Sequence, residues 1–346
     1  MKKINIVKMS FLTILMTSPN VFAEPMYTIA FPDSTYNFPR AVISPDGNNF
    51  ALGLLSLKSF ASALAREESV LWDGDSYISN IAYSPDGNYL FVGDYEYQGK
   101  IIDARTGKIL FEIKSYTYSH RKEIKFPNTG GINCSEFWPD GSKLLTADSE
   151  GFVELWDVKT GNKVHQYDLP LDYMKYIKLS HDCKRLYVQG IGAFTTIDLD
   201  NEKIIEMISS ETSSLSADVK WLLSNAGQIV HIRDVDTGEI IKEFSLRLPE
   251  FVNSLDISSN KKYSVIGGLN RNGIYSPRMI LNNETGQIER TYPDTKGRSK
   301  NDPYGNDIII RFFPDGRRYL TVNGSNVHIW DISDLYANVE GANIHK

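Results

Sequence analysis

The sequence has few of the features that mark disulfide-rich, membrane-spanning or nucleic-acid-binding proteins. It contains only two cysteines in 346 residues, Cys134 and Cys183, so no disulfide framework supports the fold, and whether these two pair stays open. No apolar run approaches the roughly 20 residues that cross a bilayer. Acidic residues outnumber basic ones by 43 to 37, which gives a net charge of -6 and disfavours general nucleic-acid binding.

The first 23 residues have the order of a secretory signal peptide. Lys2, Lys3 and Lys8 precede or flank an apolar run that ends at Met16, and Val21-Phe22-Ala23 resembles a cleavage site. We therefore predict a signal peptide at 1–23, cleavage after Ala23, and a periplasmic or secreted protein that forms a single domain over residues 24–346. Without the three lysines the mature chain has 34 basic and 43 acidic residues, a net charge near -9.

Motifs for catalysis, cofactors or metals are also missing. The six histidines form no His-Glu-x-x-His pair, and no Gly-x-Ser-x-Gly elbow, phosphate-binding glycine loop or dinucleotide fingerprint is present. We predict no catalytic residue, no cofactor and no metal site. His231 and His328 occupy equivalent repeat positions with Glu154 and Thr195, and alternation along the strands places all four on one side, which we expect to be solvated.

A short turn sequence recurs along the chain. "SPDG" occurs at 44–47 and again at 84–87, with "WPDG" at 138–141 and "FPDG" at 313–316, and degenerate forms begin at Ser180, Ser216 and Ser258. The second residues of these seven turns are 40, 54, 42, 36, 42 and 55 residues apart. The shorter gaps match the period of roughly 40–45 residues expected for propeller blades, and the long gaps indicate insertions.

A second signature follows five of the turns by about twenty residues, in units that begin it at Ile101, Leu155, Thr196, Ile232 and Leu281. It reads "IIDARTGKIL" from Ile101, "LWDVKTGNKV" from Leu155 and "IRDVDTGEII" from Ile232, where an Asp and a Thr-Gly pair turn the chain into the next strand. Short Tyr-, Val-, Leu- and Ile-rich runs surround both signatures, as expected for strands. Each repeat thus predicts four antiparallel strands.

Seven such units predict an all-β fold, a seven-bladed β-propeller of four-stranded antiparallel blades. The chain resembles the WD-repeat family at these positions, with Trp156-Asp157 and Trp330-Asp331 at the place of the family's dipeptide. Its degenerate repeats, many with Ile-Asp or Arg-Asp instead, are similar to those of exported bacterial propellers. The last unit lacks a fourth strand, and "MYTIAF" at 26–31 is a strand without a unit, so we expect the N-terminal strand to join the last blade and close the ring.

The irregular loops are the candidate binding surface. Strand alternation places the regular turns on one face of a propeller and the irregular loops on the other. The longest loops are 114–131, between units two and three, and 291–306, between units six and seven; with shorter loops in units six, one and two they form one arc of a closed ring. Residues 114–131 carry four Lys/Arg and one Glu, a local charge of +3. Tyr and Arg anchor many interfaces, and loops on rigid scaffolds often bind. The candidate partner-binding residues are Tyr95, Tyr97, Tyr116, Tyr118, Arg121, Lys122, Tyr275, Arg298, Lys300 and Tyr304.

These observations predict a non-enzymatic interaction scaffold that binds a protein or other acidic macromolecule through one loop face. We expect a monomer without a membrane span and without nucleic acid as partner. Two alternatives stay open. One is a propeller enzyme, a hydrolase or cofactor-dependent dehydrogenase, with its site at the mouth of the central channel. The other is a structural subunit of an envelope assembly.

Overall fold

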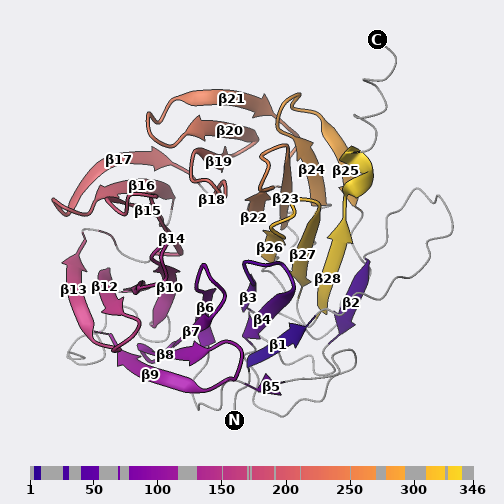
Figure 1. Ribbon diagram of the computed structural model, residues 1–346. Helices are drawn as coiled ribbons and strands as arrows, with labels where there is room; N and C mark the ends of the chain where they lie inside the picture. The colour runs from indigo at the N-terminus through magenta and orange to yellow at the C-terminus, as the bar shows by residue number, and fades with distance from the viewer. Residues whose placement is uncertain are drawn as a thin grey trace. The chain divides into compact units, whose positions relative to one another are not determined.

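The protein folds as two compact units of antiparallel sheet (Figure 1). The computed structural model describes residues 4–8, 26–30, 40–53, 69–70, 78–115, 131–149, 151–169, 171, 174–190, 192–210, 212–249, 251–269, 278–292, 309–323 and 326–336. Unit 1 comprises Met1–Lys8 and Pro39–Glu211, and unit 2 comprises Met9–Phe38 and Thr212–Lys346. Each unit is considered by itself below.

Unit 1 contains three sheets in which four consecutive strands follow one another. These are β6 (Ile78–Tyr83), β7 (Tyr89–Asp94), β8 (Gln98–Asp103) and β9 (Ile109–Lys114); β10 (Ile132–Phe137), β11 (Lys143–Asp148), β12 (Phe152–Asp157) and β13 (Lys163–Asp168); and β14 (Tyr176–Leu179), β15 (Arg185–Gln189), β16 (Ala193–Asp198) and β17 (Lys203–Ser209). A further sheet has the order β3 (Arg40–Ile43), β4 (Asn49–Gly53), β1 (Ile4–Lys8) and β5 (Ser69–Val70).

Unit 2 contains two sheets of four consecutive strands and one that includes an early segment. The first two are β18 (Thr212–Leu215), β19 (Trp221–Ala226), β20 (Ile229–Asp234) and β21 (Ile240–Ser245), and β22 (Phe251–Ile257), β23 (Tyr263–Leu269), β24 (Arg278–Asn282) and β25 (Ile288–Tyr292). The last has the order β2 (Tyr27–Ala30), β28 (Asn326–Asp331), β27 (Arg318–Asn323) and β26 (Ile309–Phe312). A helical turn at 333–336 follows β28.

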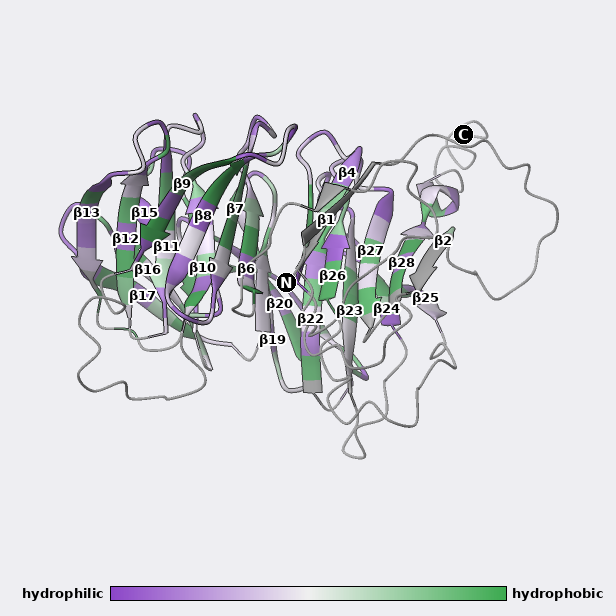
Figure 2. Cartoon of the chain, turned by 90° about the horizontal axis from the view of Figure 1, so that it is seen from below, coloured by the Kyte–Doolittle hydropathy of each residue, from purple (hydrophilic) through white to green (hydrophobic). Residues whose placement is uncertain are grey.

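The burial of each strand follows its position in the sheet. The middle strands β12 and β16 are buried along four consecutive residues, and the cluster between the β10–β13 and β14–β17 sheets covers one face of each. The fourth strand β17 instead alternates exposed and half-buried residues, as a strand covered on one face does. In Figure 2, which is coloured by hydropathy, green residues lie along many strands, and purple residues occur in the turns and on parts of strands such as β8 and β13.

The cores lie between successive sheets. In unit 1 a cluster that includes Val153, Leu155, Leu186 and Val188 joins the β10–β13 and β14–β17 sheets. In unit 2 a cluster that includes Leu223, Ile232, Leu255, Ile266 and Leu281 joins the β18–β21 and β22–β25 sheets. Within each unit, these two sheets therefore bury apolar faces against each other.

The two tryptophans of the predicted dipeptides are part of these cores. The Trp156 Nε1–H donates to Thr146 Oγ1 at 2.9 Å, and the Trp330 Nε1–H donates to Thr321 Oγ1 at the same distance. Both tryptophans lie on the third strand of a sheet and both threonines on the second. The hydrogen bond satisfies a buried indole N–H that the core would otherwise leave without a partner.

The prediction of seven regular blades closed by the N-terminal strand is wrong. Within the described ranges the structure has six blades, because the first sheet departs from the pattern and takes its third strand from Ile4–Lys8 and its fourth from the two residues Ser69–Val70. The sequence after Gly53 is consistent with this, because it lacks the Asp-x-x-Thr-Gly turn that reverses the chain between the third and fourth strands in three of the other sheets. Tyr27–Ala30 pairs with β28 inside unit 2, and this pairing does not show a closed ring.

The expectation that one side of the third strands is solvated is also wrong. Glu154 is 1% exposed, Thr195 is 2% exposed and His328 is 8% exposed. Alternation along a strand shows which residues share a face, but a neighbouring sheet covers this face as well. Burial and the nearby Arg278 guanidinium lower the pKa of His328 to about 4.

The two cysteines are both free thiols, Cys134 buried and Cys183 half-buried. The Cys134 thiol lies 3.7 Å from the carbonyl oxygen of Met174. Within the described ranges, no helix has the length and the apolar character that a bilayer crossing needs.

Candidate functional site

The turn between the first and second strands of each sheet is held by similar hydrogen bonds. In the β6–β7 turn, Ser84 Oγ donates to Asp86 Oδ1 at 2.6 Å and accepts from the Tyr89 N–H at 2.9 Å. Gly87 lies between them in the left-handed region with φ 72°. Equivalent serine bonds hold the turns that begin at Ser44, Ser180, Ser216 and Ser258. The turns are thus a rigid frame for the side chains at their ends.

In unit 2 this frame carries a lysine where other turns have glycine. Lys261 has φ 62°, and the corresponding Gly87 and Gly316 have φ 72° and 64°. The left-handed conformation costs a residue with a side chain about 1–2 kcal/mol. Cys183 and Val219 occupy the same turn position with φ 58° and 55°, so the frame of the turn tolerates this strain in three of the sheets.

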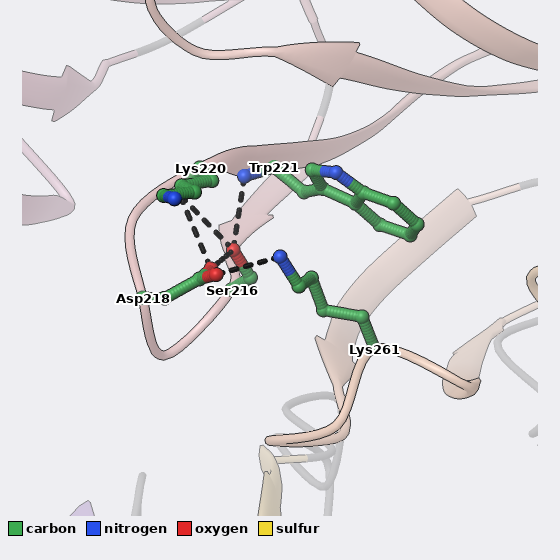
Figure 3. Close-up of polar contacts among 5 residues, drawn as sticks. All are labelled: Ser216, Asp218, Lys220, Trp221 and Lys261. Carbon is green, nitrogen blue, oxygen red and sulfur yellow. Dashed lines mark hydrogen bonds and ion pairs between the residues drawn. The ribbon is translucent and has the colours of Figure 1, made fainter.

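The Lys261 side chain bridges two neighbouring turns of unit 2 (Figure 3). Its Nζ lies 2.6 Å from Asp218 Oδ2 in the β18–β19 turn and 5.0 Å from the centroid of the Trp221 ring. Asp218 Oδ1 also accepts from Ser216 Oγ at 2.6 Å. Burial opposes ionisation of Asp218, but Lys261 and Ser216 outweigh it and hold the pKa of this carboxyl below its ordinary value.

A second bridge joins the next pair of turns through Tyr336. The Tyr336 hydroxyl donates to the carbonyl oxygen of Gly316 at 2.8 Å and accepts from Asn260 Nδ2 at 3.1 Å. Two cations face its ring, with Lys262 Nζ at 5.0 Å and the Arg317 guanidinium carbon at 5.3 Å from the centroid. One buried ring therefore positions positive charges from two different sheets.

We call this group of side chains the turn cluster. The turns 216–221, 258–263 and 313–318 together hold five Lys/Arg and two Asp, a net charge of +3 in a chain of net charge -6. Lys220 and Arg317 are exposed, and Lys262 is half-buried. The turn cluster consists of Lys220, Trp221, Lys261, Lys262, Arg317 and Tyr336.

Three of these cations have no carboxylate partner within the described part of the chain. Asp218 pairs with Lys261, and the other acidic residue of the three turns, Asp315, pairs with Arg318 at 2.6 Å. No described carboxylate lies within 4.0 Å of Lys220, Lys262 or Arg317. The positive charge of the turn cluster is therefore only partly neutralised.

The first strands of the sheets carry a different set of polar residues, which pair with each other. In unit 1, Lys178 Nζ on β14 lies 2.5 Å from Glu136 Oε1 on β10. Burial raises the pKa of Glu136, and the lysine opposes that shift. Among the described residues, no group of three or more His, Cys, Asp or Glu side chains could hold a metal ion.

In unit 2, Asp256 connects first strands of neighbouring sheets. Its Oδ1 accepts from Ser214 Oγ on β18 at 2.8 Å, and its Oδ2 accepts from the Phe312 N–H on β26 at 2.7 Å. Burial raises the pKa of Asp256, and the Arg311 cation lowers it in part. These polar groups join neighbouring first strands to each other.

The structure describes two of the ten predicted site residues. Tyr97 is 1% exposed, and its hydroxyl lies 3.0 Å from Ser149 Oγ, so its side chain packs inside unit 1. Tyr95 is half-buried in the same β7–β8 turn. The other eight lie outside the described residues: Tyr116, Tyr118, Arg121, Lys122, Tyr275, Arg298, Lys300 and Tyr304.

Sequence reasoning missed the turn cluster, although the sequence contains a signal for it. The last two positions of the early turns are Asn48-Asn49 and Asn88-Tyr89, without a cation. Lys or Arg occupies one or both of these positions in every later turn, and Asn260 replaces the turn aspartate in one of them. A comparison of side-chain charge at equivalent repeat positions would have located the cluster.

Comparison with known proteins supports a WD-repeat β-propeller. Residues 120–157 match the family described as WD domain, G-beta repeat. The chain is 23% identical over 215 residues to a guanine nucleotide-binding protein subunit beta of Nicotiana tabacum, with 56% of this chain and 54% of that protein covered. The chain thus spans about half the length of this relative.

Two further relatives and one solved structure agree. A WD repeat-containing protein 55 homolog of Dictyostelium discoideum is 26% identical, with 52% of this chain and 42% of that protein covered. Pre-mRNA-processing factor 19 of Oryza sativa subsp. japonica is 23% identical, with 41% and 29% covered. A chain of the solved structure titled "Crystal Structure of Mitotic Checkpoint Complex" superposes with a TM-score of 0.67 over 93% of this chain and 98% of that one, at 15% identity, which shows the fold alone.

Proposed function

We propose that this chain is a non-enzymatic scaffold that holds protein partners on the ends of rigid sheets. The observation that carries the proposal is the pairing of its polar side chains. Glu136 is paired with Lys178, and Asp256 receives two hydrogen bonds, so these carboxylates join strands instead of converging on one open site. A framework of this kind supports binding at its loops and turns, where interaction residues are usually found.

The relatives favour protein partners over small molecules. The solved structure with the same fold is titled as a complex, and the G-protein beta relatives are named as subunits. Since this chain covers about half of those relatives, their individual partners are not transferred. The shared element is a repeat fold whose surfaces bind other proteins.

We also propose that the scaffold acts outside the cytoplasm and binds through its irregular loops. The export proposal rests on the N-terminal order of lysines, apolar run and Ala23, and it requires that cleavage removes β1 (Ile4–Lys8) from the first sheet. The loop proposal rests on the charge of +3 in residues 114–131 and on the tyrosines of the candidate set. An acidic protein surface is the complementary partner.

Two experiments test these proposals. Pull-down with wild-type protein is compared with a variant that reverses Arg121, Lys122, Arg298 and Lys300 to Glu, and loss of partner recovery is expected. Equal recovery from both baits would remove the loop face from the proposal.

The second experiment determines the N-terminus of the protein secreted or extracted from the producing cell. A start at Glu24 is expected, and a retained Met1 would contradict export with cleavage.

A further inference from the structure

We propose that the turn cluster of unit 2 is a second binding site, which takes an acidic segment of a protein partner. This site lies in the turns between first and second strands, and the function proposed above uses the irregular loops. Substitutions at one site can therefore abolish its binding without affecting binding at the other. The inference rests on the geometry of the described residues in three turns and the helical turn 333–336.

The first argument is that the cations are positioned before any partner binds. Lys262 Nζ and the Arg317 guanidinium lie 5.0 and 5.3 Å from the centroid of one ring, that of Tyr336. Tyr336 is 9% exposed, and its hydroxyl is bonded to both turns, so the ring cannot rotate away without breaking two hydrogen bonds. A ligand that meets pre-positioned cations loses less conformational entropy on binding.

The second argument is that these cations can still bind an anion. Aromatic faces attract a cation but leave its N–H donors free to bind a carboxylate. No described carboxylate lies within 4.0 Å of Lys220, Lys262 or Arg317, and Lys220 and Arg317 are exposed. A planar guanidinium binds carboxylates through two parallel hydrogen bonds.

The third argument concerns Lys261, which occupies a left-handed position that Val219 and Gly316 take in the two neighbouring turns. Its Nζ lies 2.6 Å from Asp218 and neutralises this carboxylate beside the Trp221 ring. The ion pair thus reduces the repulsion that an acidic ligand would meet. The half-buried Trp221 ring lies beside these cations and offers an apolar contact to the ligand.

Charge distribution identifies the occupant as a short acidic peptide segment. The three turns have a net charge of +3, but the whole chain has -6 and Asp334 lies next to the cluster, where it pairs with Arg290. A long uniform polyanion such as duplex nucleic acid would extend past the cluster onto the rest of a chain whose net charge is negative. A peptide with a few Asp or Glu side chains fits within the positive area.

The test measures binding of a fluorescein-labelled dodecapeptide of repeated Asp-Glu-Gly by fluorescence anisotropy at low salt. Full-length protein is compared with K262Q/R317Q, which removes two cations, and we expect affinity to fall roughly fivefold or more. The matched control is K184Q/R185Q, which removes two cations from the corresponding turn of unit 1 and should leave affinity unchanged. A peptide of repeated Asn-Gln-Gly should not bind the wild-type protein.

Three results would overturn the proposal. These are equal affinities of wild type and K262Q/R317Q, an equal loss in K184Q/R185Q, and binding of the neutral peptide. The variant K261G keeps the left-handed backbone while it removes a cation, so it provides a second perturbation that does not strain the turn, and it should also weaken binding. Near-ultraviolet circular dichroism verifies that each variant is folded. Charge reversal of Arg121 and Lys122 should leave peptide affinity unchanged, which separates this site from the loop face.

Discussion

The guanidinium carbon of Arg278 lies 4.0 Å from the centroid of the Trp330 ring, between two sheets of unit 2. Arg278 is the first residue of β24 and is 6% exposed, while Trp330 lies on β28 and is 2% exposed. Tyr292 adds a second ring face, 5.8 Å from the same guanidinium carbon. A cation over the face of tryptophan thus joins adjacent sheets of unit 2.

Replacing Arg278 by lysine should destabilise the protein although the charge is kept. An ammonium group cannot stack its plane on an indole and is more strongly hydrated, so R278K should lose about 1–2 kcal/mol of unfolding free energy. Urea unfolding followed by tryptophan fluorescence measures the loss. R105K, at an exposed turn position, is the control and should unfold at the wild-type urea concentration. Equal midpoints for R278K and R105K would show that the stacking contributes nothing.

The contribution of the Trp330–Thr321 hydrogen bond to stability should appear when variants of Thr321 with and without a hydroxyl group are compared. Thr321 is 0% exposed, so T321V leaves the buried indole N–H without its acceptor at nearly unchanged volume. The expected loss is about 1–3 kcal/mol. T321S keeps the hydroxyl and loses only a methyl group, so it should be the more stable of the two variants in thermal unfolding. The reverse order would contradict the assigned role of this bond.

The sequence predicted the turns and strands better than it predicted their surroundings. Ser84, Asp86 and Gly87 form the hydrogen-bonded turn that their residue types favour, because serine and aspartate bond to nearby backbone and glycine adopts positive φ. The strands on either side follow from alternation and β-branched content. These are local properties, so a single sequence contains them.

What the sequence did not predict depends on neighbours in space. His328 was expected in solvent, yet a second sheet covers it, and period two cannot distinguish a covered polar face from a free one. The strand inserted from Ile4–Lys8 replaces one that repeat counting placed after Gly53. The turn cluster required knowledge of which turns lie next to each other, since Lys261 and Asp218 are 43 residues apart.

Glycine at 286 should be required for close packing as well as for backbone conformation. Gly286 has φ 75°, and a Cβ placed there would lie 2.4 Å from Cδ1 of Phe244 on the preceding sheet. G286A should therefore cost about 2–3 kcal/mol, the sum of left-handed strain and displacement of the ring. Gly227 is the matched control, because it has φ 57° and a Cβ added to it would meet no atom within 4 Å.

Comparison of the two alanine variants isolates the contact with Phe244. G227A should lose only the backbone contribution, about 1 kcal/mol, so its thermal midpoint should lie between those of wild type and G286A. Coinciding midpoints for both variants would show that the ring moves away at no cost. The double variant G286A/F244L should recover part of the loss, since leucine leaves more space than phenylalanine.

Buried His328 should make the protein less stable as the medium becomes acidic. Burial and Arg278 lower the pKa of His328 from 6.5 to about 4 in the folded chain, so between these values the unfolded chain binds a proton that the folded chain does not. The contribution of His328 to the free energy of unfolding is therefore fully present above about pH 6.5. It is lost as the pH falls toward 4, by about 3 kcal/mol over the full interval. H328Q cannot titrate and should lack this part of the pH dependence. Urea unfolding of both proteins between pH 7 and pH 4 measures the difference, and parallel profiles would show that His328 titrates alike in the folded and unfolded chains.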